Sequence, residues 1–326
     1  MTVLEGEAMG DRHTLLAWAE RGALTDLAQA LRAAGALPGA SDWRVFLDRL
    51  LLWSGAVALA AAVVFFIAHN WNDLGKYAKF GLVEALIVVA VLGYWRLGPE
   101  RAAGRASLLV ASILLGALLA LFGQTYQTGA DTWELFANWA GLMLPWVIVG
   151  RFAGLWMLWI AILNTAIVFY FLVFPGLLGI LFSTERQLWT LFAFNTVALV
   201  AWELASRRLA WLAERWAPRL LATTSGAIVT VLMLLAIFEW REASGLTPVV
   251  YLAWLACAYA AYRSFGRDLL VLAGGCLSVI VVVTGFLGKN LIRAEAGGFL
   301  LIALVVIGMG AAAGWWLKQV AKEAEA

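Results

Sequence analysis

The sequence predicts an all-α protein: a polytopic transmembrane helical bundle of about ten spans, preceded by a short helical segment. Hydrophobic residues are 63% of the 326 residues and charged residues only 13%, whereas soluble domains average about 45–50% and about 25%. Apolar runs of about 20 residues, enough to cross the roughly 30 Å hydrocarbon core, recur between residues 50 and 317. Since lipid offers the backbone no hydrogen bonds, and since the runs lack the alternating period of a membrane barrel, we expect helices.

The first 49 residues contain no long apolar run. His13–Glu20 and Thr25–Ala34 are predicted to be short amphipathic helices, and Asp42–Arg49 is predicted to lead into the membrane. Two short helices bury little apolar surface by themselves. We therefore expect residues 1–49 to dock on the bundle, on the membrane surface or on a protein partner.

The bundle itself is predicted over residues 50–317, followed by a tail over 318–326. Pro175 and Gly176 interrupt the region 152–183, where a re-entrant or interfacial turn is an alternative to a simple connection. The predicted spans are 50–69, 77–97, 106–123, 134–150, 152–172, 187–205, 219–240, 246–263, 268–287 and 296–317.

The lysines and arginines predict how the chain threads the membrane. With these spans, 17 of the 23 lysines and arginines fall on the same side as the N-terminus. Cytoplasmic connections carry the excess of lysine and arginine, so both termini are predicted to be cytoplasmic. The connection 124–134 then faces outward, and it contains no lysine or arginine.

That connection holds the strongest candidate site in the sequence. Gln124, Thr125, Tyr126 and Gln127 offer neutral hydrogen-bonding groups and a ring face, and Gly123 and Gly129 suggest a tight turn around them. The residues that follow begin the next span: Asp131, Trp133 and Glu134, with Asn138 one helical turn beyond Glu134. Carboxylates are also favourable at a helix N-terminus, so an alternative is that Asp131 or Thr132 is the N-cap and Glu134 lies in the first turn.

Two further polar features are predicted on the same outer side. The first is the turn His69-Asn70-Trp71-Asn72-Asp73 after the first span. The second is Glu84, seven residues into the second span, about 10 Å below its outer end. A carboxylate at this depth is costly, so Glu84 is predicted to face the bundle interior, as a functional group or in a structural hydrogen bond. Asn164 and Asn195 favour interhelical hydrogen bonding.

Several of these segments resemble one family. Phe65-Phe66-Ile67-Ala68-His69-Asn70-Trp71, the run from Gly123 to Asp131, and Trp139 to Pro145-Trp146 are similar to the bacterial membrane proteins of domain-of-unknown-function family 2157. The leading Trp18-Ala19-Glu20-Arg21-Gly22-Ala23-Leu24 matches the opening of that family. The resemblance covers roughly residues 12–150. It implies a bacterial inner-membrane protein, and it assigns no activity.

We expect a carrier or binding protein for a small polar or lipid-linked ligand, with a polar and aromatic pocket facing the periplasm. The alternatives are a scaffold or envelope sensor that docks a protein partner through residues 1–49 or the outer connections, and a membrane-embedded enzyme. No phosphate-binding loop, dinucleotide fingerprint, nucleophile elbow or zinc-protease motif is present, and dispersed basic residues indicate no nucleic-acid partner. No catalytic residue, metal site or cofactor is predicted, and membrane lipid is an expected partner. The candidate ligand-binding residues are Glu84, Asn70, Trp71, Asn72, Asp73, Gln124, Thr125, Tyr126, Gln127, Asp131, Trp133, Glu134 and Asn138.

Overall fold

The computed structural model describes residues 39–69, 74–173, 184–238, 245–265, 268–291 and 295–325, together with three single residues near the N-terminus. Most of the two predicted N-terminal helices, the turn Asn70–Asp73 and the Pro175-Gly176 break lie outside the described residues. Within these ranges all regular secondary structure is helical. The helices are α3 (Ala40–His69), α4 (Lys76–Leu97), α5 (Ala102–Tyr126), α6 (Thr132–Gly150), α7 (Ala153–Val173), α8 (Thr184–Ser206), the 3₁₀ turn η1 (Ala210–Leu212), α9 (Trp216–Phe238), α10 (Thr247–Ala260), the π-helical turn η2 (Ala261–Phe265), α11 (Leu269–Leu291) and α12 (Glu295–Glu325).

Each predicted span corresponds to one of the helices α3 to α12, which confirms the polytopic all-α prediction. Eight of these helices are long and apolar enough to cross a membrane. The other two are α6, which contains Glu134, Asn138 and Pro145, and α10, whose 14 α-helical residues continue into the π-helical turn η2. At 1.5 Å per residue, α10 alone reaches about 21 Å, short of the hydrocarbon thickness.

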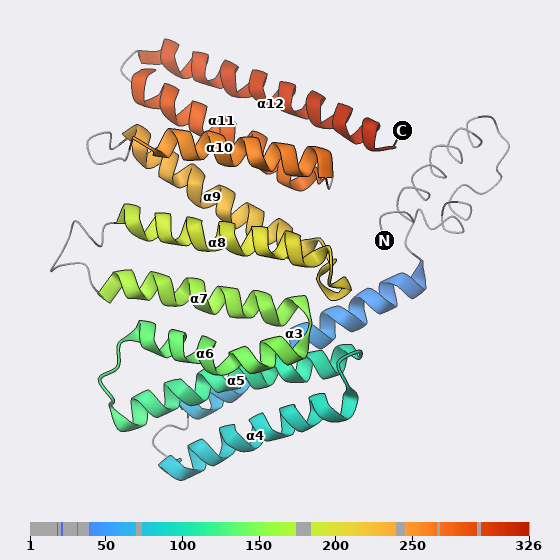
Figure 1. The fold of residues 1–326 in the computed structure, drawn as a ribbon, viewed down its shortest axis with the longest axis vertical. Coiled ribbons are helices and arrows are strands. Elements are labelled where there is room, and N and C mark those ends of the chain that lie inside the picture. Colours follow the sequence, from blue (N-terminus) through green and yellow to red (C-terminus); the bar gives the residue numbers. More distant parts are fainter. Residues whose placement is uncertain are drawn as a thin grey trace.

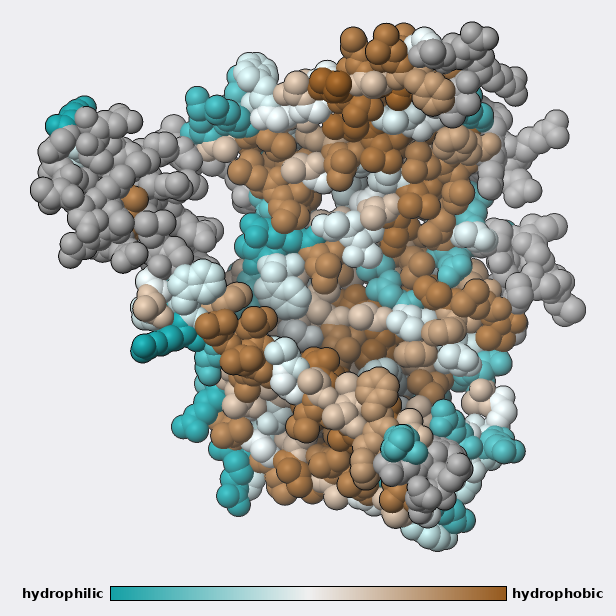
Figure 2. Space-filling model, turned by 180° about the vertical axis from the view of Figure 1, so that it is seen from behind, coloured by the Kyte–Doolittle hydropathy of each residue, from teal (hydrophilic) through white to brown (hydrophobic). Residues whose placement is uncertain are grey.

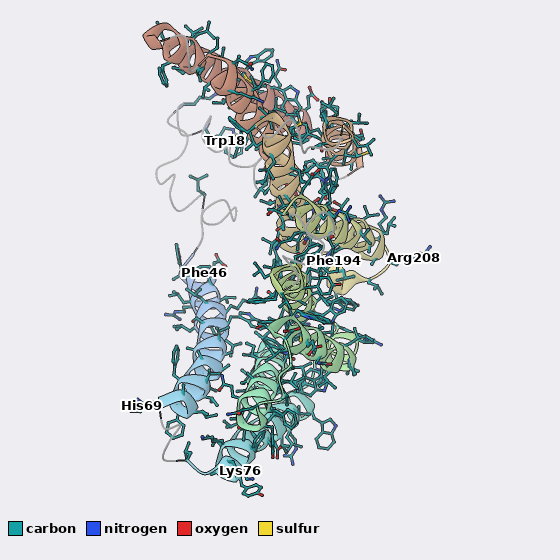
Figure 3. The ribbon with its side chains drawn as sticks, turned by 90° about the vertical axis from the view of Figure 1, so that its left-hand side faces the viewer. Trp18, Phe46, His69, Lys76, Phe194 and Arg208 are labelled. Carbon is teal, nitrogen blue, oxygen red and sulfur yellow. The ribbon has the colours of Figure 1, made fainter. Side chains whose placement is uncertain are left out.

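The helices α4 to α12 form a row of elements that lie side by side largely in chain order (Figure 1). Helix α3 lies against one face of this row, where it packs mainly on α5 (Figure 3). Successive helices run in opposite directions, so their connections alternate between two ends. We call the end that holds the α5–α6 connection the rim end, and the end that holds Arg105, Arg151 and Arg215 the basic end.

The start of α3 and the end of α12 both lie at the basic end (Figure 1). The alternation therefore places the predicted inside arginines and lysines of helices α3 to α12 and their described connections together at one end. Hydrophobic side chains cover the middle of the helices and hydrophilic ones gather mainly toward their two ends (Figure 2). This pattern fits helices whose outer faces contact lipid.

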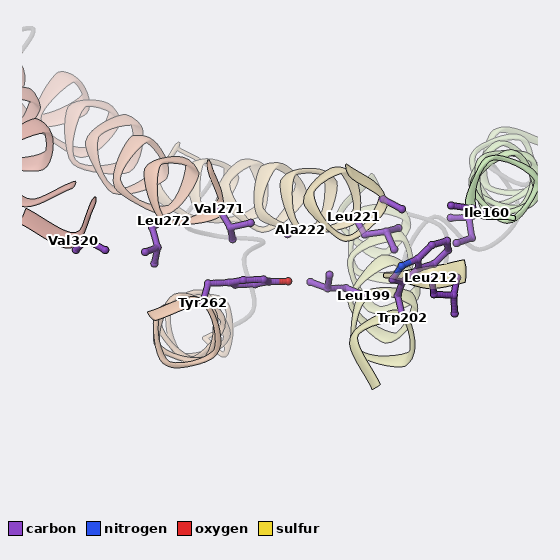
Figure 4. Packing of buried hydrophobic residues seen from close by; sticks show 12 residues of the cluster. Ile160, Leu199, Trp202, Leu212, Leu221, Ala222, Tyr262, Val271, Leu272 and Val320 are labelled. Carbon is purple, nitrogen blue, oxygen red and sulfur yellow. The ribbon is translucent and has the colours of Figure 1, made fainter. Parts of the chain in front are cut away.

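Among the helices that could cross a membrane, α5 and α9 are the most enclosed. In their apolar windows 39% of α5 and 44% of α9 are buried, against 6% for α4 and α12 at the edges. Around α9, a large apolar cluster near the basic end joins Leu199 and Trp202 of α8, Leu221 of α9, and Tyr262 of η2 (Figure 4). Helix α9 thus packs against α8, α10 and α11 and connects the helices of the C-terminal half of the row.

Two glycines allow close helix contacts in the same way. A Cβ on Gly116 of α5 would lie 2.5 Å from the Trp139 ring of α6, and one on Gly226 of α9 would lie 2.7 Å from the Trp254 ring of α10. The Trp139 indole N–H also donates to the Ser112 carbonyl at 2.8 Å. A small residue facing a large ring therefore fixes the α5–α6 and α9–α10 contacts.

Candidate functional site

The predicted outer stretch is divided among three elements at the rim end. Gln124, Thr125 and Tyr126 form the last turn of α5, Gln127 to Asp131 form the connection, and Thr132 begins α6. The prediction that the turn begins at Gln124 is wrong. No glycine or proline lies between Gly123 and Gly129, so helical geometry continues through Tyr126.

The turn itself consists of two residues with positive φ and their neighbours. Gln127 ends α5 with φ 47°, and Gly129 follows with φ 68°. The expectation of a tight turn is therefore correct for Gly129, where the backbone needs a residue without Cβ. Gly123 lies within α5 and does not shape the turn.

Asp131 occupies the N-cap position of α6, as the alternative reading of this residue proposed. Its side chain makes no capping hydrogen bond; the Glu134 N–H donates instead to the Asp131 backbone carbonyl at 3.0 Å. Gln124, Gln127, Asp131 and Asn138 are exposed, and Glu134 is half-buried. We call the α5–α6 turn with its flanking residues, 124–138, the rim. The rim presents amide and carboxylate side chains to its surroundings.

Aromatic rings lie on both sides of this polar turn. On the side of α4 and α5, the Tyr126 ring centroid lies 4.9 Å from that of Phe122 and 6.0 Å from that of Phe80. On the side of α6 and α7, the Trp133 and Tyr170 rings meet edge to face at 5.2 Å. A planar or ring-shaped ligand at the rim would find ring faces on either side.

Two of the predicted residues carry buried polar atoms without a partner among the described residues: Thr125 Oγ1 and Trp133 Nε1. A buried donor left unsatisfied costs about 1–3 kcal/mol. Trp156 of α7 and Trp202 of α8 have unsatisfied indole nitrogens as well, but both pack into the apolar cluster near the basic end. At the rim the unsatisfied atoms belong to residues that flank exposed polar side chains.

Glu84 does not face the interior as predicted. The inward face of α4 contains Lys79 and Val83, which are buried, whereas Glu84 is exposed. Consecutive helical residues are rotated by about 100°, so a buried Val83 turns Glu84 toward the outside. Its expected orientation is wrong, and its role in ligand binding stays a prediction.

The predicted interhelical amides do meet. Asn195 Nδ2 donates to Asn164 Oδ1 at 2.6 Å, and Asn164 Nδ2 donates to Asn195 Oδ1 at 3.2 Å, joining α7 to α8. Asn195 is only 1% exposed. This geometry supports the structural reading of the pair.

Sequence reasoning missed two hydroxyl networks deep in the C-terminal half. Ser225 of α9 bonds with Thr196 of α8 at 2.6 Å and accepts the Trp254 indole N–H at 3.1 Å. Ser278 of α11 lies 2.6 Å from Thr230 and 2.9 Å from the Tyr251 hydroxyl. Single serines and threonines in apolar runs gave no signal of this pairing, which depends on helix rotation.

A charge network at the basic end was also missed. The buried Asp268, 1% exposed, accepts hydrogen bonds from Arg219 Nε at 2.8 Å and from an Arg215 terminal nitrogen at 3.3 Å. Arg215 also contacts Glu203 at 3.4 Å, and the Tyr262 hydroxyl donates to Glu203 at 2.9 Å. The network links α8, α9, η2 and α11. The feature of the sequence that could have indicated this network is Asp268 itself, an aspartate immediately before an apolar run.

Comparison with known proteins agrees with the resemblance seen in the sequence. Residues 16–156 match a family model described as "Predicted membrane protein (DUF2157)". This segment includes α3 to α6 and thus the whole described part of the rim turn. No curated protein and no solved structure matches the chain significantly.

Proposed function

Starting from an integral membrane protein whose DUF2157-like segment contains the rim, we propose that the rim end binds a small polar or lipid-linked ligand, as a carrier or binding protein does. The observation that carries the proposal is the pair of buried donors without a partner among the described residues, Thr125 Oγ1 at the end of α5 and Trp133 Nε1 at the start of α6. A ligand with acceptor oxygens would satisfy both donors. The cost of burying them is then offset when the ligand is bound.

The surrounding groups suit the same ligand chemistry. Gln124 and Gln127 supply amide donors and acceptors, and Asp131 supplies a carboxylate that α6 does not use as a cap. The rings of Tyr126 and Trp133 supply flat apolar faces. A hydroxyl-rich molecule with a ring, such as a sugar or a polar lipid headgroup, uses both kinds of contact.

We also propose an orientation of the chain in the membrane. The basic end would face the cytoplasm of a bacterial inner membrane, because it carries most of the lysines and arginines. The rim would then face the periplasm and meet ligands there.

Native mass spectrometry of the gently purified full chain tests the binding proposal. Thr125→Val and Trp133→Phe each remove one unsatisfied donor while retaining the size or the ring of the side chain. We expect the wild type to carry a discrete adduct that both variants lose. Trp156→Phe is the matched control, because it removes an equally unsatisfied indole N–H away from the rim, and it should keep the adduct.

A second readout comes from stability. If no ligand uses these donors, Thr125→Val and Trp133→Phe remove only an uncompensated polar group and should leave the protein as stable or more stable. Retention of the adduct in both rim variants would refute the proposal. Bulk lipid alone on all four proteins would refute it as well and would favour a protein-docking role for the rim.

A further inference from the structure

The largest of the described cavities lies at the basic end, opposite the rim. Its volume is about 770 Å³, and its walls come from α3, the start of α5, the start of α7, η1, the start of α9 and the connections that precede α5, α7 and α9. Two arginines, two glutamates and three tryptophans contribute to these walls. This composition is unlike that of the other described cavities, whose linings carry no arginine or glutamate.

The charged groups stand at the level where lipid headgroups lie. After Arg49 the next 19 residues of α3 carry no charge, and 19 helical residues are about 28 Å long, close to the hydrocarbon thickness. Arg105 likewise precedes 25 uncharged residues. Both arginines therefore mark the boundary of the apolar layer, and Trp53 lies one turn inside it, where tryptophan is favoured.

One arginine and one glutamate of the cavity wall, Arg105 and Glu214, are each oriented by a local hydrogen bond. Arg105 Nε donates to the Pro99 carbonyl at 2.6 Å, and a guanidinium has further N–H donors for a phosphate. Glu214 accepts the Trp216 indole N–H at 2.8 Å, and a carboxylate has further acceptor sites for an ammonium group. The cavity thus offers partners for a cationic and an anionic group of the same molecule.

An apolar cavity adjoins the polar one. It has a volume of about 380 Å³ between α7 and α8, and Trp211 belongs to the walls of both cavities. Its lining is almost entirely aliphatic and aromatic, including Trp159 and Phe194. A polar chamber beside an apolar chamber fits an amphiphile, with its head in the first and an acyl chain in the second.

We propose that the basic-end cavity binds a phospholipid whose headgroup pairs a phosphate with a primary amine, the phosphate on Arg49 and Arg105 and the ammonium on Glu100 and Glu214. The primary amine follows from the two carboxylates, which accept N–H hydrogen bonds that a trimethylammonium group cannot donate. The site is independent of the ligand proposed at the rim.

The test uses the full chain in mixed micelles with phosphatidylethanolamine, phosphatidylglycerol and phosphatidylcholine of identical acyl chains. Native mass spectrometry counts the lipid that stays bound after delipidation. We expect one retained phosphatidylethanolamine in preference to the other two. The double variant Arg49→Gln with Arg105→Gln should lower its retention about fivefold to tenfold, as expected for losing charge-assisted hydrogen bonds at a partly exposed site.

Matched controls separate a site from general surface charge. Arg44→Gln with Arg96→Gln removes two exposed arginines from the same end outside the cavity, and it should leave retention unchanged. Glu100→Gln with Glu214→Gln should abolish the preference for the amine headgroup while keeping lipid bound. Thermal unfolding of each variant confirms that it is folded before lipid is counted.

Three results would overturn the proposal. Equal retention of phosphatidylglycerol or phosphatidylcholine by the wild type would show that no primary amine is selected. Unchanged retention in the arginine double variant would show that the cavity is not the site. Displacement of the lipid by equimolar soluble glycerophosphoethanolamine would show that the acyl chain is not bound. Variants at Thr125 and Trp133 should leave this lipid in place, so failure here and failure at the rim are distinguishable.

Discussion

Removing the buried carboxylate of Asp268 should destabilise the C-terminal half of the protein. The side chain is 1% exposed and accepts three hydrogen bonds, from Arg219 at 2.8 Å, Arg215 at 3.3 Å and the Leu270 N–H at 3.2 Å. Hydrogen bonds to charged groups contribute about 1.5–3 kcal/mol each. However, the Arg215 and Arg219 side chains are 34% and 44% exposed, so both can regain water or headgroup contacts when Asp268 is lost.

The partial exposure of the two arginines determines how much stability the loss of Asp268 should cost. A fully buried pair that loses one partner costs about 3–5 kcal/mol, whereas an exposed pair is worth about 0–1 kcal/mol. With a buried acceptor and half-exposed donors, we expect Asp268→Ala to lower the free energy of unfolding by about 2–3 kcal/mol. Asp268→Asn keeps an acceptor for the Leu270 N–H and should lose about 1–2 kcal/mol, because only the charge is removed.

Unfolding is measured by denaturant titration of the purified protein in mixed micelles, followed by tryptophan fluorescence. Glu185→Ala on the opposite end of α8 is a control for a partly buried carboxylate outside the network, and it should change stability less. An Asp268→Ala protein as stable as the wild type would refute the argument. So would an Asp268→Asn protein less stable than Asp268→Ala, since the ranking depends on the retained Leu270 bond.

Three further outcomes follow from the helix contacts and the threading. Gly116→Ala should lower the free energy of unfolding by about 1–3 kcal/mol by overpacking against Trp139. Gly141→Ala has open space around its Cβ and should be neutral or slightly stabilising in the same titration, because alanine has the higher helix propensity; equal effects would contradict the close contact. A double-mutant cycle with Asn164→Leu and Asn195→Leu should give a coupling energy of about 0.6–1.7 kcal/mol, and additive single effects would refute the pairing seen in the structure. In a background with Cys257 and Cys276 replaced by alanine, a cysteine at Gln127 should react with an impermeant thiol reagent added outside intact cells and one at Arg101 should not; the reverse would invert the proposed orientation.

The structure describes part of the candidate site predicted from the sequence, and the role of that site in ligand binding stays a prediction. Thr125, Tyr126 and Trp133 were selected because polar and aromatic residues stood between apolar runs, and the structure gives these three unsatisfied donors or ring contacts. The break after Tyr126 was placed too early, because glutamine, threonine and tyrosine are all compatible with a helix. Four of the thirteen predicted residues, Asn70 to Asp73, lie outside the described residues.

The sequence alone determined the order of the described helices α3 to α12 and the position of each helix along the chain. In lipid each helix satisfies its own backbone, so apolar length is a local property that can be read from each segment by itself. The distribution of arginine and lysine is similarly local, and it separated the basic end from the rim end.

Only the tertiary structure decided which face of each helix points inward. In a soluble protein the polar face of a helix indicates its rotation, but here lipid-facing and core-facing residues are both apolar, so the sequence gives little information about it. The rotation of α4 exposes Glu84, while the convergence of α9 and α11 buries Asp268 between two arginines. The cavity that brings Arg49 of α3 near Glu214 depends on the same packing, because those residues are far apart in the chain and no local pattern connects them.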